Sequence, residues 1–113
     1  MTGVIQVLTT TASQEEAQKI ARALVESRLA ACVQVIGPIT STYHWNGAIE
    51  TGQEWMCVAK TRASHYAAVE LAIQAVHSYE VPEILAVEVT LGARGYLDWL
   101  SGELADLSGP QIA

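Results

Sequence analysis

The repeat distance of the apolar residues changes several times along the chain, and this alternation constrains the fold more than any single motif. Residues 4–8 and 84–91 are short runs rich in branched apolar side chains, which is typical of buried strands. Ala17, Ile20 and Leu24 instead recur at helical spacing. We therefore predict strands at residues 4–8, 31–45, 48–61 and 84–91, helices at residues 13–28 and 64–76, and a short C-terminal helix around residues 96–100.

The predicted order is βαββαβ followed by a helix, which is the split-βαβ or ferredoxin-like arrangement of the α+β class. In this arrangement both long helices cover one face of an antiparallel sheet, and the other face stays open. The length of 113 residues suits one domain, so we expect residues 1–113 to form it, with a disordered tail after about residue 107. The open face offers a surface for a second copy of the chain.

A long hairpin is predicted in the middle of the chain, because Asn46 and Gly47 are the two residues best able to adopt positive φ in a tight turn. Each arm is about 14 residues long, more than twice the usual strand length of about 5–6 residues. Aromatic residues near this hairpin could form a wall for a ligand, or they could pack at an interface between copies. They are Tyr43, Trp45, Trp55 and Tyr79.

The net charge of the chain is −6, from 12 acidic and 6 basic residues, and the basic residues form no run. This balance argues against a nucleic acid as partner. No apolar stretch reaches the roughly 18 residues that are needed to cross a bilayer, and the first residues show no signal-peptide pattern. We therefore expect a cytoplasmic protein that binds neither nucleic acid nor membrane.

Cys32 and Cys57 lie in apolar runs typical of strands, and two cysteines are too few for a disulfide framework. Buried reduced thiols are the simplest interpretation, with one disulfide or a soft-metal pair as the alternatives. We expect His44 to be exposed or to face a neighbouring subunit, because it alternates away from its aromatic neighbours. We also expect His65 to be exposed, at the start of a helix.

Ser13 and Ser64 are predicted to cap the two long helices, and Glu16 completes the pattern of a capping box after Ser13. The threonines of residues 9–11 are predicted to form a loop before the first helix, where free N–H groups and hydroxyls could hold an anion. Lys60 on an adjacent predicted strand could add positive charge beside this loop. Ordinary turn chemistry is the alternative interpretation of the threonines.

The predicted turn at residues 77–84 carries a proline, two carboxylates, an imidazole and a phenol. Within this turn, His77, Glu80 and Glu83 offer donors that suit copper(II) or zinc. Pro82 interrupts any shared helical face, so spacing alone does not show that the three side chains converge. His77 could instead stabilise the carboxyl end of the second helix, and both acids could be solvated.

Four separated blocks of the sequence resemble the CutA family of divalent-cation tolerance proteins, in the order of the family. The blocks are residues 28–33 (RLAACV), 43–50 (YHWNGAIE), 60–61 (KT) and 77–84 (HSYEVPEI). The resemblance extends from near residue 8 to Leu100. It implies a stable homotrimer of ferredoxin-like subunits, joined through the sheet and the long hairpin, cytoplasmic in bacteria and associated with tolerance to copper and other divalent metals.

The resemblance also implies, for some members of the family, a copper site made by a cysteine, a histidine and a glutamate. The glutamate corresponds to Glu83, whereas the cysteine position is Thr9 and the histidine position is Val76 in this chain. The adjacent His77 is the predicted substitute. We therefore expect weak binding of copper(II) or another divalent metal by His77 and Glu83, and no organic cofactor.

Two other functions stay open at the level of the sequence. Signalling proteins of the PII type share the subunit fold, and by this analogy the chain could be a trimeric sensor of a small anionic metabolite or nucleotide. The residues that we select for its cleft are Thr10, Lys60, Trp45, Tyr79 and Glu80. An enzyme would use Glu83 or Tyr79 as acid or base, but no catalytic motif accompanies them, so we assign no catalytic residue.

Overall fold

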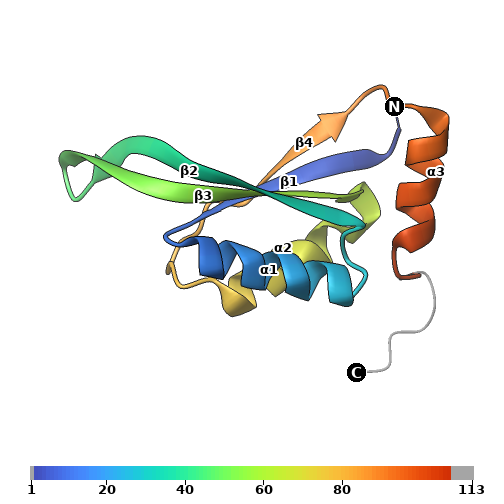
Figure 1. Cartoon of the computed structure of the whole chain (residues 1–113), viewed down its shortest axis with the longest axis horizontal. Coiled ribbons are helices and arrows are strands. Elements are labelled where there is room, and N and C mark those ends of the chain that lie inside the picture. Colours follow the sequence, from blue (N-terminus) through green and yellow to red (C-terminus); the bar gives the residue numbers. More distant parts are fainter. Residues whose placement is uncertain (1, 108–113) are drawn as a thin grey trace.

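The computed structural model describes residues 2–107, and its helices and strands follow the predicted order (Figure 1). The strands are β1 (Val4–Thr11), β2 (Cys32–Trp45), β3 (Ala48–Arg62) and β4 (Leu85–Val89), and the helices are α1 (Gln14–Glu26), α2 (Tyr66–Val76) and α3 (Arg94–Glu103). A 3₁₀ turn at Ala63–His65 precedes α2. The disorder predicted after about residue 107 lies outside the described residues.

The four strands form one antiparallel sheet in the order β2-β3-β1-β4. Helices α1 and α2 lie against the same face, and α3 stands at the end of the sheet where β1 begins (Figure 1). This arrangement confirms the predicted ferredoxin-like α+β fold. Most of the opposite face carries no helix, so it is open as predicted.

The core lies between the sheet and the helices α1 and α2. Its fully buried side chains include Val7 on β1, Ile20 and Leu24 on α1, and Val69 and Ile73 on α2. Burying an aliphatic side chain of this size contributes about 1.5–3 kcal/mol. The helical spacing in the sequence therefore marks the faces of α1 and α2 that pack on the sheet.

Strand β1 is longer than predicted. Residues 9–11, expected to be a loop, continue the strand and pair with Cys57, Met56 and Trp55 of β3. All three threonines are buried. Threonine is β-branched and suits a strand, and the long β3 provides a partner, so the loop prediction was wrong. No loop is present at these described positions to hold an anion.

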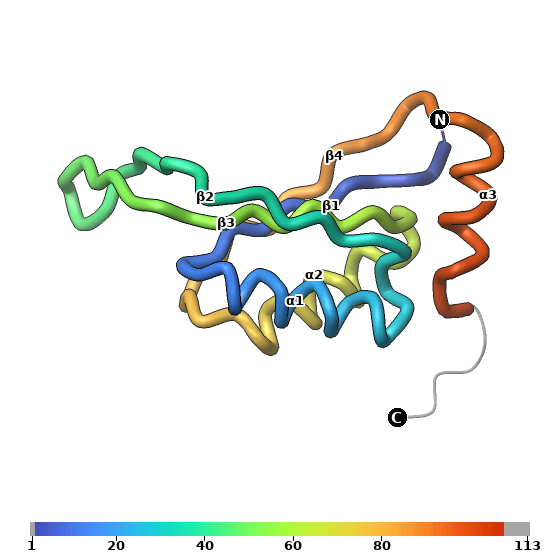
Figure 2. Tube along the Cα trace, in the orientation of Figure 1, coloured from blue at the N-terminus to red at the C-terminus, as the bar shows by residue number. Residues whose placement is uncertain are grey.

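Strands β2 and β3 form the predicted hairpin, which extends beyond the helices (Figure 2). Asn46 and Gly47 at its turn have φ values of 50° and 79°, which confirms the tight turn with positive φ. The arms span 14 and 15 residues. Their register shifts between Ile36 and Ile39, where the Gly37-Pro38 peptide bond is cis.

The starts of α1 and α2 differ in how well the local sequence predicted them. Ser13 caps α1 as predicted and accepts a hydrogen bond from the N–H of Glu16 at 3.1 Å. Ser64 belongs instead to the 3₁₀ turn, and its hydroxyl lies 3.0 Å from Nδ1 of His65. His65 is buried rather than exposed, because its Nε2 donates to the carbonyl oxygen of Ala105 at 2.7 Å.

Candidate functional site

The turn at residues 77–84 is held by hydrogen bonds to neighbouring elements, and His77 makes the first of them. Nε2 of His77 donates to the carbonyl oxygen of Thr10 at 2.7 Å, and Nδ1 accepts the backbone N–H of Tyr79 at 3.1 Å. Because a carbonyl only accepts and a backbone N–H only donates, these partners select the neutral tautomer with its proton on Nε2. Both ring nitrogens of His77 are therefore engaged.

Two carboxylates complete the attachment of the turn. Oε2 of Glu16 accepts the backbone N–H of Ser78 at 2.9 Å, so Glu16 joins α1 to the turn instead of closing the predicted capping box. Oε2 of Glu54 on β3 accepts the hydroxyl of Tyr79 at 2.9 Å. Burial, followed by the hydrogen bond to Glu54 and its charge, raises the pKa of Tyr79 to about 12. The phenol therefore stays protonated and holds the turn against the hairpin.

An open groove with a volume of about 740 Å³ lies between this turn and the hairpin. It is lined by Thr10, Ser41, Thr42, Tyr43, Trp45, Glu54, Tyr79, Glu80, Val81 and Glu83. Three of these residues are glutamates, three are aromatic and none is basic. The groove is therefore acidic and partly apolar, a combination that favours cations over anions.

Thr10 is the one buried residue in the lining of the groove, with only 6% of its surface exposed. Its carbonyl oxygen accepts from His77, but its hydroxyl has no hydrogen-bond partner within residues 2–107. The hydroxyl of Thr10 is not one of the buried unpartnered atoms of residues 2–107, so solvent in the groove reaches it.

Comparison with known proteins identifies the family. The family described as CutA1 divalent ion tolerance protein matches residues 5–103. The chain belongs to the CutA family. The divalent-cation tolerance protein CutA of Thermus thermophilus is 45% identical over 94 residues, which are 83% of this chain and 91% of that protein. Protein CutA of Homo sapiens is 44% identical over 88 residues, which are 78% of this chain and 49% of the human protein.

Solved CutA structures share the fold described above. The CutA1 structure from Thermus thermophilus has a TM-score of 0.88 at 41% sequence identity, covering 90% of this chain and 99% of that chain. The CutA1 structure from Oryza sativa has a TM-score of 0.89 at 32% identity, covering 94% and 99%. Both the predicted family and the predicted fold are thus confirmed.

In this CutA chain, most of the predicted site residues line the groove. They are Thr10, Trp45, Tyr79, Glu80 and Glu83. Lys60 does not line it: it pairs with Gln6, and its ammonium group lies 5.6 Å from the centroid of the Tyr96 ring. Along β1, Gln6 and Thr10 are separated by four residues, or about 13 Å. The structure therefore does not bring Lys60 and Thr10 together.

The donor set for a metal is not assembled within one copy of this CutA chain. Across residues 2–107, no group of three or more histidine, cysteine, aspartate or glutamate side chains is placed to hold a metal ion. At the position of the family's cysteine, the hydroxyl of Thr9 is buried without a hydrogen-bond partner. The side chains present therefore do not fit a thiolate copper site in one copy.

Cys57 lies opposite Thr9 on β3, yet it does not replace the missing thiolate. The residue is buried, and its thiol donates to the carbonyl oxygen of Ala17 at 3.4 Å. Burial, followed by the charge of Glu16, raises the pKa of Cys57 to about 11, so the thiol keeps its proton at neutral pH. Cys32 is also free but only half-buried, so the expectation of a buried thiol is correct for Cys57 alone.

Glu54 lines the groove, although it was not among the site residues predicted from the sequence. The alternation of side chains along a strand could have predicted this position. Tyr43 pairs with Glu50, and Glu54 lies four residues after Glu50, so Glu54 is on the same face of the hairpin as Tyr43. Its hydrogen bond to Tyr79 joins residues 25 positions apart, and no local pattern indicates such a pair. Ser41 lies on the same face of β2 as Tyr43, and Thr42 lines the groove as well.

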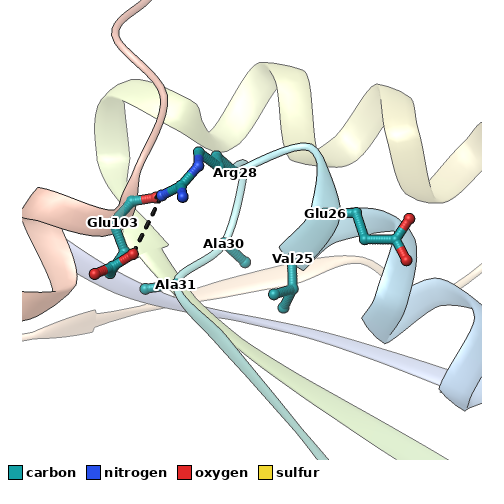
Figure 3. A pocket seen from close by; sticks show the side chains of 6 residues that line it. All are labelled: Val25, Glu26, Arg28, Ala30, Ala31 and Glu103. Carbon is teal, nitrogen blue, oxygen red and sulfur yellow. Dashed lines mark hydrogen bonds and ion pairs between the residues drawn. The ribbon is translucent and has the colours of Figure 1, made fainter.

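A second pocket of about 240 Å³ lies where α1 ends (Figure 3). Arg28 donates to the backbone carbonyl and to the carboxylate of Glu103, at 3.0 and 3.2 Å. Val25, Ala30 and Ala31 supply its apolar side chains. Arg28 is paired with Glu103, and the third charged residue of the lining, Glu26, is paired with Arg22 at 3.0 Å. This part of the CutA fold therefore joins α1 to α3, and each of its charges already has a partner.

Proposed function

We propose that this CutA chain acts in divalent-cation tolerance as a cytoplasmic homotrimer that binds copper(II) or another divalent ion weakly at the clefts between subunits. The charge of the groove is the observation that carries the proposal. Glu54, Glu80 and Glu83 supply carboxylate oxygens, and the lining contains no basic side chain that would repel a cation. Such oxygens bind divalent ions at partly solvated sites.

Glu83 and His77 differ in how readily they could bind a metal. Glu83 is exposed in the lining and needs no rearrangement to meet an ion. His77 would first have to release either the carbonyl oxygen of Thr10 or the N–H of Tyr79. We therefore assign the first contact to the glutamates, and His77 stays a predicted ligand whose binding requires a change in the turn.

The proposed trimer is supported by apolar side chains that one copy leaves in water. Ile36, Leu85 and Val87 are exposed, and the strand register places them on the face away from α1 and α2. Trp45 and Ile49 are exposed on the hairpin. Large apolar surfaces of this kind mark interfaces, and copies joined through the sheet and the hairpin would bury them.

The proposed cytoplasmic location is supported by the two free cysteines, because reduced thiols persist in reducing compartments. Within residues 2–107, no helix is long and apolar enough to cross a membrane. The relatives differ in location: the CutA structure from Archaeoglobus fulgidus is described as periplasmic, and the Arabidopsis thaliana relative as chloroplastic. Fractionation of the source cells, with an antibody against the chain, tests the assignment.

Calorimetric titration of the purified chain with copper(II) and zinc tests the metal proposal. We expect weak binding to the wild type and a loss of about tenfold in affinity for Glu80→Gln/Glu83→Gln, because two carboxylate oxygens lose their charge. Glu88→Gln is the matched control, since Glu88 is exposed on β4 and does not line the groove. Unchanged affinity in the double variant would refute the site. A separate titration of His77→Ala measures any contribution of the imidazole.

The alternative function, a PII-like sensor of a small anionic metabolite or nucleotide, is favoured by the size of the groove. Its volume of about 740 Å³ is within the range of about 300–1,000 Å³ that is usual for small-molecule sites. The charge opposes this alternative, because Lys60 lies over Tyr96 and no basic residue lines the groove. A thermal-shift screen with ATP and citrate tests this alternative. The sensor function is excluded if neither ligand raises the melting temperature of the wild type, or if both raise that of Lys60→Ala by the same amount.

A further inference from the structure

We propose that one water molecule is bound beneath the turn at residues 77–84, between the hydroxyl of Thr9 on β1 and Oε1 of Glu16 on α1. The site lies inside one copy of the chain, on the face of the sheet that α1 and α2 cover (Figure 1), so it does not depend on how copies assemble. It is separate from the groove, and the inference does not rest on the proposed metal function.

Two side-chain oxygens carry the proposal. Within residues 2–107, the buried side-chain nitrogen and oxygen atoms without a hydrogen-bond partner are Oγ1 of Thr9 and Oε1 of Glu16. Thr9 as a whole is only 1% exposed. An unpaired buried polar atom raises the free energy of the folded state, so such an atom is often the sign of a bound water or ion. Each of the two oxygens therefore points to a ligand.

Thr9 and Glu16 are both neighbours of the buried thiol of Cys57. Thr9 pairs with Cys57 across β1 and β3, which places the two side chains on the same face of the sheet. The thiol donates to the carbonyl oxygen of Ala17 at 3.4 Å, and Ala17 directly follows Glu16 on α1. After burial, the charge of Glu16 is the second cause that raises the pKa of Cys57 to about 11. The carboxylate of Glu16 is therefore within electrostatic reach of the residue that lies opposite Thr9.

The turn connects the same two places from its own side. His77 donates from Nε2 to the carbonyl oxygen of Thr10 at 2.7 Å, and Thr10 directly follows Thr9. The next residue, Ser78, donates its backbone N–H to Oε2 of Glu16 at 2.9 Å. Consecutive residues of the turn thus bind the neighbour of Thr9 and Glu16 itself. The two unpaired oxygens therefore lie at the joint between β1, α1 and the turn.

A water molecule suits this pair of oxygens better than an ion does. A carboxylate oxygen accepts hydrogen bonds and a hydroxyl also donates them, so water can donate to Glu16 while it accepts from Thr9. Divalent cations at oxygen sites take about six ligands or more, and residues 2–107 hold no group of three metal-binding side chains. An anion would meet the charge of Glu16, which has no basic partner among the ion pairs of the described residues. One water molecule satisfies both oxygens and adds no charge.

The site lies at the position where the family resemblance implies a cysteine. Thr9 supplies an oxygen there, whereas thiolates are the ligands that select copper(I). A water molecule held by Thr9 and Glu16 therefore takes the place of a soft metal ligand. It also fastens the start of α1 to β1 beneath the turn.

A double-mutant cycle, measured by urea unfolding of the full-length chain, tests the proposal. Thr9→Val keeps the shape of the side chain but leaves the bound water with one partner fewer, so we expect the folding equilibrium constant to fall about tenfold. Glu16→Gln keeps an acceptor for the N–H of Ser78 and replaces the charged carboxylate by an amide. The two substitutions together should cost less than the sum of their separate losses, because both act on one water molecule.

Thr61→Val is the matched control. Thr61 is also fully buried, but its hydroxyl donates directly to the carbonyl oxygen of Leu29 at 2.7 Å. Thr61→Val should destabilise the fold and combine additively with Glu16→Gln. If the hydroxyl of Thr9 has no partner, Thr9→Val stabilises the fold instead, because it removes a buried polar group. Stabilisation by Thr9→Val, or additive losses in Thr9→Val/Glu16→Gln, would overturn the proposal.

NMR spectroscopy of the wild type identifies the ligand without any substitution. We expect a nuclear Overhauser effect between a long-lived water molecule and the methyl protons of Thr9. The urea midpoints in potassium chloride and in tetramethylammonium chloride, at equal ionic strength, should agree, because a cation that binds the folded state would raise its stability. Absence of the water signal, or extra stability in potassium chloride that Thr9→Val abolishes, would contradict the inference.

Discussion

His77 is a structural residue in one copy of the chain, because each ring nitrogen has a backbone partner. We predict that His77→Ala lowers the free energy of unfolding by about 1–3 kcal/mol, since it leaves the carbonyl oxygen of Thr10 and the N–H of Tyr79 unpaired. Urea unfolding, followed by tryptophan fluorescence, measures this loss.

Two further substitutions separate the two hydrogen bonds of His77. Asparagine at this position offers an acceptor near the place of Nδ1, and glutamine offers a donor near the place of Nε2. Each should restore part of the stability that His77→Ala loses. Unchanged stability in His77→Ala, together with a loss of copper affinity, would contradict the structural role and favour a role in metal binding.

The hydroxyl of Tyr79 makes the stability of the fold sensitive to high pH. Burial, then the hydrogen bond to Glu54 and its charge, raises the pKa of Tyr79 from 10.0 to about 12. Because the folded state holds this proton more tightly than the unfolded state, the stabilising contribution is complete below pH 10 and is lost as the pH rises through about 12. We predict that the wild type loses stability more steeply than Tyr79→Phe across this range, as measured by urea unfolding.

The comparison with Tyr79→Phe isolates one titration among several. The pKa values of Tyr66 and Cys57 are also raised, chiefly by burial, but both residues are common to the two proteins. The difference between the two pH profiles therefore reports on Tyr79. Parallel profiles would show that the hydrogen bond to Glu54 does not link this phenol to folding.

The sequence predicted which residues of the turn carry chemistry, but not what holds them. His77 and Tyr79 stand out by residue type within a short turn. Their partners, Thr10 and Glu54, lie 67 and 25 positions away along the chain. Such pairs form only when distant strands meet, and periodicity or capping patterns carry no information about them. The metal hypothesis for His77 depended on a free imidazole, which residue type alone does not show.

Among the elements, the hairpin was predictable and the length of β1 was not. Asn46 and Gly47 determine their own turn through the backbone conformations that these residues prefer. Residues 9–11 form a strand because residues 55–57 of β3 pair with them. The end of β1 is therefore set by a distant partner, whereas the end of β2 is set by the residues that follow it.

Gly37 allows the indole of Trp55 to pack directly on β2. A Cβ atom at this position would overlap Cδ1 of the ring and lie 2.7 Å from Cγ. We predict that Gly37→Ala lowers the free energy of unfolding by about 1–3 kcal/mol, because the ring must move out of its packed position. The midpoint and slope of urea unfolding measure the change.

Gly52→Ala is the matched control on β3, where the nearest atom to an added Cβ is the hydroxyl oxygen of Tyr43 at 3.9 Å. Adding Trp55→Leu to Gly37→Ala removes the obstructing ring. If contact with the ring is the cause, the two substitutions together should cost less than the sum of their separate effects. Additive losses would assign the effect to the backbone of β2.

The whole molecule measures 45 × 35 × 23 Å, and its long axis follows the sheet and the projecting hairpin (Figure 2). Helix α3 is attached at one end of the sheet, where Leu100 is buried and Arg62 donates to the hydroxyl of Ser101 at 2.9 Å. The rest of the open face keeps apolar side chains in water, among them Leu85 and Val87. In one copy, the surface through which the proposed trimer would assemble is therefore exposed to solvent.

Leu85 and Leu71 test whether that surface is an interface. Leu85 is 57% exposed on the open face of the sheet, and Leu71 is 69% exposed on α2, which covers the other face. We predict that Leu85→Glu converts the trimer to monomers in sedimentation velocity, because a carboxylate buried at an interface without a partner is costly. Leu71→Glu should sediment as the wild type, and both should keep the wild-type circular dichroism, since neither side chain belongs to the core. Trimeric Leu85→Glu, or equal dissociation of both variants, would exclude the open face as the basis of assembly.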